Sequence, residues 1–132
     1  LYEEITSTEN ARRYLDLLNM EWKDYDDFER KYGSDNNPDS FAKRYSSWWF
    51  YDGIGLLLNK KFVNLDMVYE LGGIQAIWQW KKWESIIKEQ RKRYKVPDLG
   101  IWFEYLAKEL MKKREQMGIV AEVPKTYGRY TK

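Results

Sequence analysis

Residues 73–95, GIQAIWQWKKWESIIKEQRKRYK, decide the fold, because they hold three of the seven tryptophans and the densest run of positive charge. At 100° per residue, one stripe of a helix contains Ala76, Trp80, Trp83, Ile87 and Tyr94, with Ile86 at its edge. The opposite side contains Lys81, Lys88, Lys92 and Lys95, but the first turns also place Ile74, Ile77 and Trp78 near that side. The stretch therefore predicts a helix that starts inside the core and reaches solvent in its later turns.

Other helices are predicted on both sides of this stretch from their start and stop signals. The first helix starts at a capping box with Thr6 as N-cap and runs to about Met20, and a short helix follows from Asp24 to Gly33. The third runs from Asn37-Pro38 to about Asn59. A short helix capped by Asn64 or Asp66 ends at Gly72-Gly73, and the last helix is capped by Asp98 and ended by Gly118. No alternating pattern long enough for a strand pair is present. We expect an all-α fold, a compact bundle of five to six helices with an extended C-terminal tail. Residues 1–118 would form a single helical domain and residues 119–132 a basic, irregular tail.

The predicted helix over residues 38–59 is apolar on every face, which is typical of a central, enclosed helix. It contains Gly53 and Gly55, each of which costs about 1 kcal/mol relative to alanine within a helix. We expect close approach of a neighbouring helix to offset that cost.

Composition limits the chemistry available to the chain. It has no cysteine and no histidine, so thiolate nucleophiles, histidine-based catalysis and the common zinc sites are excluded. The net charge is only +2, but residues 1–40 are rich in acids and residues 81–132 are rich in bases. No apolar run approaches the length of a membrane span. We expect no catalytic residue, no metal site and no cofactor.

Asp52 lies in the middle of an apolar face of the predicted 38–59 helix. A buried carboxylate needs a partner or takes up a proton. The favoured interpretation is a buried polar network, an ion pair or hydrogen bond with Arg12, Arg13 or Arg91, and Arg91 is better placed to meet Asp52 than to meet a phosphate. The alternative is a perturbed acid in an aromatic pocket, where a small molecule or a substrate would bind.

The strongest candidate for a binding surface is the basic face of the 73–95 helix. Its members are Lys81, Lys82, Lys88, Lys92, Arg93 and Lys95. Such a face is suited to nucleic-acid phosphates or anionic lipid headgroups, although it matches no known DNA-reading motif. The alternative interpretation is a solvated face that is partly paired with the acidic N-terminal part.

Two further patterns are more typical of structure than of a site. The aromatic residues of 48–51 and 78–83 have helical spacing, which favours core packing over a stacking platform for a planar ligand. The acidic cluster at 24–29 lacks the spacing and the glycine of an EF-hand, which favours a solvated helix start.

Several segments of the chain resemble a prokaryotic family of uncharacterised helical domains. The resemblance lies in Tyr2-Glu3-Glu4, Thr8-Glu9, Ala11-Arg12-Arg13, Gly55 to Leu58, Leu65-Asp66, Trp83/Ile87/Arg91 and Phe103 to Leu106. In that family, a single N-terminal transmembrane helix precedes the domain. The resemblance implies an all-α domain tethered to a membrane and facing the cytoplasm, and it implies no activity. The chain begins at Leu1, which fits the expectation that an anchor precedes it.

These patterns favour a protein without enzymatic activity, most simply a module that binds or regulates an unknown protein partner. We expect it on the cytoplasmic side of the inner membrane or in the cytoplasm, with membrane contact through the missing anchor. The first alternative is binding of nucleic acid or anionic lipid through the basic face. The second is a small-molecule binder or an enzyme around Asp52.

Overall fold

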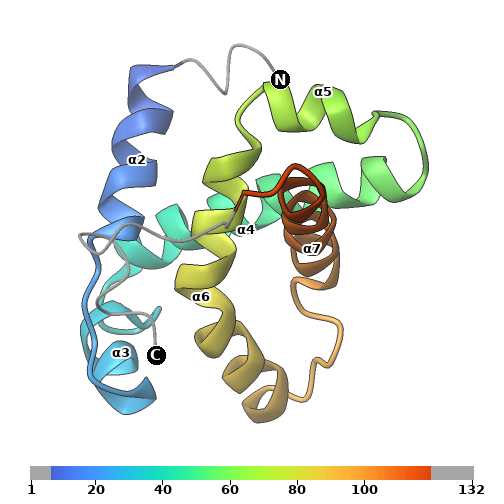
Figure 1. Ribbon diagram of the computed structural model, residues 1–132. Coiled ribbons are helices and arrows are strands. Elements are labelled where there is room, and N and C mark those ends of the chain that lie inside the picture. Colours follow the sequence, from blue (N-terminus) through green and yellow to red (C-terminus); the bar gives the residue numbers. More distant parts are fainter. Residues whose placement is uncertain (1–6, 120–132) are drawn as a thin grey trace.

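The computed structural model describes residues 7–119, which form six α-helices and no strand (Figure 1). The helices are α2 (Thr8–Leu18), α3 (Tyr25–Tyr32), α4 (Pro38–Asn59), α5 (Leu65–Glu70), α6 (Gly73–Arg93) and α7 (Ile101–Gln116). The all-α helical bundle predicted from the sequence is confirmed. The predicted tail over 119–132 lies outside the described residues except for Ile119.

Short polar side chains start four of the helices. Asp24, Asn37 and Asn64 each accept a hydrogen bond from the backbone N–H three residues later. The sequence predicts Asp24 and Asn37, and Asn64 is one of the two caps it allows for α5, the other being Asp66. At α2, the N-cap is Ser7, which accepts from the Asn10 N–H at 3.0 Å, and not the predicted Thr6.

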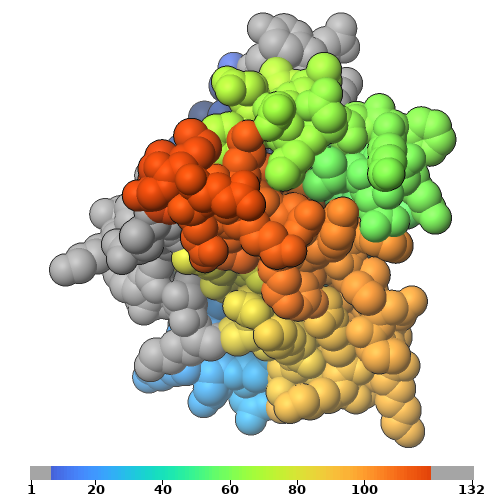
Figure 2. All heavy atoms as spheres, turned by 45° about the vertical axis from the view of Figure 1, so that its right-hand side comes forward, coloured from blue at the N-terminus to red at the C-terminus, as the bar shows by residue number. Residues whose placement is uncertain are grey.

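The helices pack as a bundle in which α6 crosses α4 near the middle of the view in Figure 1. In that view, α2 and α3 lie on one side of α6, and α5 and α7 lie on the other. The most extensive helix pair is α4 with α7, followed by α6 with α7. Figure 2 shows a face on which α5 and the end of α7 lie side by side, where Lys113 of α7 contacts Asp66 of α5.

The most enclosed helix is α6, which has buried residues from Gly73 to Gln90. The prediction that the 38–59 helix is enclosed on all sides is wrong, because α4 exposes Trp49, Leu56 and Leu57. Only α7 contacts α4 extensively, whereas α2 and α3 each contact it at a few residues, so part of the apolar surface of α4 is covered by none of the described helices. The surplus apolar surface of α4 is therefore available for other contacts.

Aromatic rings fill the larger part of the core around Trp83. Its ring centroid lies 5.1 Å from Trp22, 5.8 Å from Phe28 and 5.7 Å from Trp48. A second buried cluster contains Ala76, Ile77, Leu106 and Leu110. Four of the seven tryptophans are at least 97% buried, namely Trp22, Trp48, Trp80 and Trp83, which fits the core interpretation, whereas Trp49 is 68% exposed.

Gly55 allows α7 to approach α4 closely. A β-carbon at this position would lie 2.0 Å from the backbone oxygen of Trp102, which is too close for any side chain. The close approach predicted for the glycines is therefore found at Gly55. At Gly53, a β-carbon would meet nothing within 4 Å.

We expect Gly55→Ala to lower the free energy of unfolding by about 1–3 kcal/mol, because the added methyl group pushes α7 away from α4. Gly53→Ala is the matched control and should raise the free energy of unfolding by up to about 1 kcal/mol through helix propensity. Urea unfolding followed by circular dichroism measures both values. Equal effects of the two substitutions would show that Gly55 does not set the distance between the helices.

Candidate functional site

The basic face predicted on α6 is not a continuous cationic surface. Lys82 is fully buried, and its Nζ donates a hydrogen bond to the Met20 carbonyl oxygen at 2.5 Å. The same Nζ lies 4.7 Å from the centroid of the Trp22 ring. The placement of Lys82 on a binding surface is therefore wrong, because the segment after α2 covers this side of α6.

Most of the remaining cations of this face make contacts within the protein. Lys88 pairs with Glu84 at 2.7 Å, and Arg93 pairs with Glu89 at 3.0 Å and with Asp26 of α3 at 3.7 Å. Lys81 is half-buried and also makes contacts. In the described part of the chain, Lys92 and Lys95 are exposed and form no ion pair. The structure thus leaves two isolated cations where the sequence predicted six.

Asp52 acts as a cap for α7 and not as a partner of an arginine. Its Oδ1 accepts hydrogen bonds from the backbone N–H groups of Trp102 and Phe103, each at 2.9 Å. These are two of the donors that the first turn of a helix leaves without a partner inside the helix. The predicted cap, Asp98, is two residues too early, since α7 begins after Gly100, which has a φ of +66° and no side chain to act as a cap. Asp52 is not among the described residues that line the apolar cavity between α2, α4, α5, α6 and α7.

The three arginines predicted around Asp52 lie elsewhere. Arg91 forms an ion pair with Glu104 at 2.9 Å, and its Nε donates to the Leu99 carbonyl oxygen at 2.7 Å. Arg13 donates to Ser46 Oγ at 3.2 Å and to Asn10 Oδ1 at 2.5 Å, and Arg12 is exposed. The predicted hydrogen bonding of Asp52 is confirmed, but the predicted network with Arg12, Arg13 and Arg91 is wrong.

The acidic cluster at the start of α3 is used for local structure. Asp24 caps α3, and Asp27 accepts the Lys23 N–H at 3.0 Å and pairs with Arg30 and Lys31. The hydrogen bond from Lys23 is the largest cause that holds the pKa of Asp27 below its usual value. Within residues 7–119, no group of three carboxylates is arranged to hold a metal ion.

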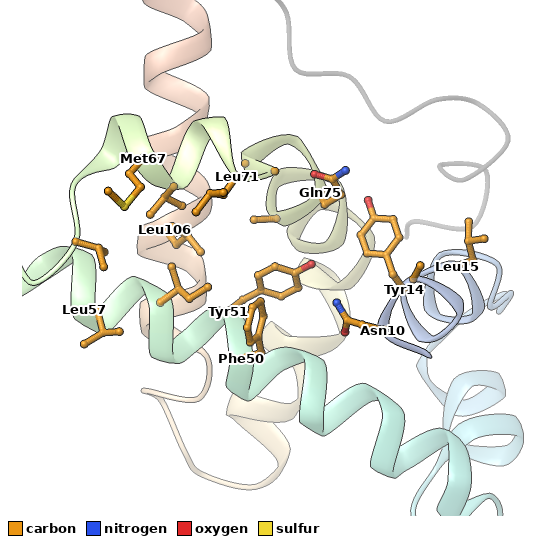
Figure 3. Close-up of a pocket in the computed structure, with 17 residues that line it drawn as sticks. Asn10, Tyr14, Leu15, Phe50, Tyr51, Leu57, Met67, Leu71, Gln75 and Leu106 are labelled. Carbon is orange, nitrogen blue, oxygen red and sulfur yellow. The ribbon is translucent and has the colours of Figure 1, made fainter. Parts of the chain in front are cut away.

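The feature best suited to binding is an apolar cavity of about 290 Å³ between α2, α4, α5, α6 and α7 (Figure 3). One end is formed by Leu57, Met67, Leu71 and Leu106, and the middle by Phe50 and Tyr51 (Figure 3). The remaining described residues of the lining are Asn10, Ala11, Tyr14, Leu15, Ile54, Val63, Val68, Gly72, Gly73, Gln75 and Ala76. Its volume is close to the lower limit of small-molecule pockets, about 300–1,000 Å³.

The polar groups of the cavity gather at its α2 end. Asn10, Tyr14 and Gln75 lie at this end in Figure 3, and the hydroxyl group of Tyr51 points toward it. These four side chains come from α2, α4 and α6, so three helices position them. An apolar cavity with a few convergent polar groups is the usual form of a ligand site.

The mouth of the cavity is also apolar. Leu15, Leu57, Met67 and Leu71 belong to the lining and are 36–53% exposed. Exposed apolar groups around a hollow are typical of a binding surface.

The sequence did not predict this cavity. Small residues at separate places in the chain, Ala11, Gly72-Gly73 and Ala76, belong to its lining, but no pattern within one segment marks them. Ala76 was expected on the core stripe, and it is buried, but it also lines the cavity.

Comparison of the chain with models of protein families, with curated proteins and with solved structures gives no match. The resemblance to a family of membrane-tethered helical domains therefore stays a prediction. Among the described helices, none is both long enough and apolar enough to cross a membrane.

We expect Arg91→Ala to lower the free energy of unfolding by about 1–2 kcal/mol, because it removes a half-buried ion pair and a hydrogen bond to a backbone carbonyl group. Lys92→Ala, at the next position of α6, should change it by less than about 0.5 kcal/mol, since Lys92 is exposed. Thermal and urea unfolding measure the difference. Equal losses would show that Arg91 does not join α6 to α7.

The Arg91–Glu104 pair also predicts a pH dependence. Burial raises the pKa of Glu104, but hydrogen bonds from Lys108 and Arg91 outweigh this effect and hold the pKa below its usual value of 4.5. The stabilisation is therefore complete above about pH 4.5 and is lost as the pH falls through the lower pKa of the folded state. Glu104→Gln should cost about 1 kcal/mol at pH 7 and clearly less at about pH 3 in urea unfolding. A cost that is the same at both pH values would contradict this role.

Proposed function

We propose that this domain binds a small apolar molecule in the cavity between α2, α4, α5, α6 and α7. The observation that carries the proposal is the cavity itself, which is lined mainly by apolar side chains and has its polar groups at one end. Transfer of an apolar molecule from water to such a lining is favourable by about 25 cal/mol for each Å² of apolar surface removed from water.

The chemistry of the lining favours binding without catalysis. Its polar groups are the phenols of Tyr14 and Tyr51 and the amides of Asn10 and Gln75. Side-chain amides do not titrate near neutral pH, and burial raises the pKa of Tyr51 above its ordinary value of 10.0. A general acid or base works best with a pKa near the operating pH, so these groups are suited to orienting a ligand.

The other hypotheses from the sequence stay predictions. A protein partner would find exposed apolar side chains at Trp49 and Phe62, which lie outside the cavity lining. Binding of nucleic acid or anionic lipid through the basic face now depends on few cations, chiefly Lys92 and Lys95. The membrane tether and the cytoplasmic location rest on the family resemblance alone.

Fluorescence titration with the uncharged apolar probe N-phenyl-1-naphthylamine tests the proposal. The unmodified protein should enhance the probe's emission with saturable binding of one molecule. Ala11→Phe should weaken binding by about tenfold, which corresponds to about 1.4 kcal/mol, because the added ring occupies space in the cavity.

The matched control is Ala42→Phe, which places the same ring at an exposed helical position of α4 outside the lining. It should leave the affinity for the probe unchanged, and both variants should keep the helical circular dichroism of the parent. Equal affinities of the parent and the Ala11→Phe variant, or no saturable binding to the parent, would refute the proposal.

A further inference from the structure

The described residues that line the cavity carry no charged side chain. Among its described residues there is no aspartate, glutamate, lysine or arginine. An ion transferred from water into such a lining loses its hydration and gains no opposite charge in direct contact, which is costly. The lining therefore discriminates against ligands that carry a full charge.

Tyr51 offers a hydrogen-bonding group inside the cavity. Its ring is stacked on the buried ring of Phe103, with the centroids 5.1 Å apart and the planes at 19°. Its hydroxyl group has no hydrogen-bond partner among residues 7–119 and points toward the α2 end of the cavity (Figure 3). Burial raises the pKa of Tyr51, so the phenol is neutral at physiological pH and can both donate and accept. A hydroxyl group on a ring whose position is fixed by stacking is suited to binding a polar group of a ligand.

The amide groups at this end complete a neutral polar surface. Arg13 donates to Asn10 Oδ1, which leaves the amide N–H groups of Asn10 for other partners. Gln75 is exposed at the same end and reaches the cavity from α6. The opposite end, at Leu57, Met67 and Leu106, has no polar side chain and suits a hydrocarbon chain.

We propose that the ligand is an uncharged aliphatic molecule with a hydroxyl or carbonyl group at one end, which forms a hydrogen bond with Tyr51 Oη. Its hydrocarbon chain extends toward Leu57 and Met67. This inference rests on the proposed function, since it assumes that the cavity is a binding site, and it adds the chemical class of the ligand.

Displacement of N-phenyl-1-naphthylamine by three ten-carbon competitors at pH 7.5 tests the inference. Decanol is uncharged, decanoate carries a negative charge and decylammonium a positive charge, while the chain is the same. Decanol should displace the probe at a concentration at least tenfold lower than either ion. Decanoate is the stricter comparison, because the guanidinium group of Arg13 donates to Asn10 and its charge also acts on the hydroxyl group of Tyr51, where it favours an anion.

Tyr51→Phe provides the second arm, since it removes only the hydroxyl group. The affinity for decanol should fall about three- to tenfold, whereas the affinity for the probe, which does not need this hydrogen bond, should be retained. Tyr45→Phe is the matched control on the same helix, because Tyr45 is partly buried and lies outside the lining. It should leave both affinities unchanged.

The two proposals fail in different ways. If the probe binds and is weakened by Ala11→Phe, but decanoate or decylammonium competes as well as decanol, the inference on ligand chemistry is wrong and the cavity remains a binding site. The inference is also wrong if Tyr51→Phe leaves the affinity for decanol unchanged. If neither the probe nor any competitor binds to the parent protein, the proposed function fails as well.

Discussion

The contact between α4 and the start of α7 is the constraint on which the rest of the structure depends. Two residues of α4, one helical turn apart, hold the same residue of α7. Asp52 accepts the backbone N–H groups of Trp102 and Phe103, and Gly55 leaves space for the carbonyl group of Trp102. A carboxylate at a helix N-terminus satisfies two donors and interacts favourably with the helix dipole. Asp52 holds α7 by hydrogen bonds, and Gly55 holds it by steric fit. The position of α7 along α4 is therefore fixed in two independent ways.

The same contact positions the cavity. Phe103 follows directly from the capped turn and is fully buried, and the ring of Tyr51, the neighbour of Asp52, stacks on it. The facing wall is held by buried polar groups of α6, since Gln79 Nε2 donates to the Tyr14 carbonyl oxygen at 3.2 Å and Lys82 to that of Met20. Trp83 Nε1 donates to Gln79 Oε1 at 3.0 Å, which fixes the direction of the amide. Buried polar groups with directional partners thus hold α2 in one register against α6.

The sequence predicts those features of the structure that depend on neighbours in the chain. The caps Asp24, Asn37 and Asn64 act on backbone groups three residues away, and these predictions are confirmed. Contacts between residues far apart in the chain could not be predicted in this way. The cap of α7 is Asp52, which accepts the N–H of Trp102 from a position fifty residues earlier in the chain. Lys82 was predicted on the basic face of its helix. It is buried because its Nζ donates to the carbonyl oxygen of Met20, a residue 62 positions away in the chain. The cavity has no local signal at all, because it depends on where five helices converge.

Two of the helices around the cavity, α2 and α5, have only small interfaces with the rest of the bundle. The helices α2 and α5 make far fewer contacts with the rest of the bundle than α4 makes with α7, and both contribute residues to the lining. A molecule that fills the cavity touches α2 through Leu15, α5 through Met67 and α4 through Tyr51, so it adds contacts between helices that otherwise meet only in part. Ligand that binds only to the folded state stabilises it by RT ln(1 + [L]/Kd). The gain in stability is therefore expected mainly at α2 and α5.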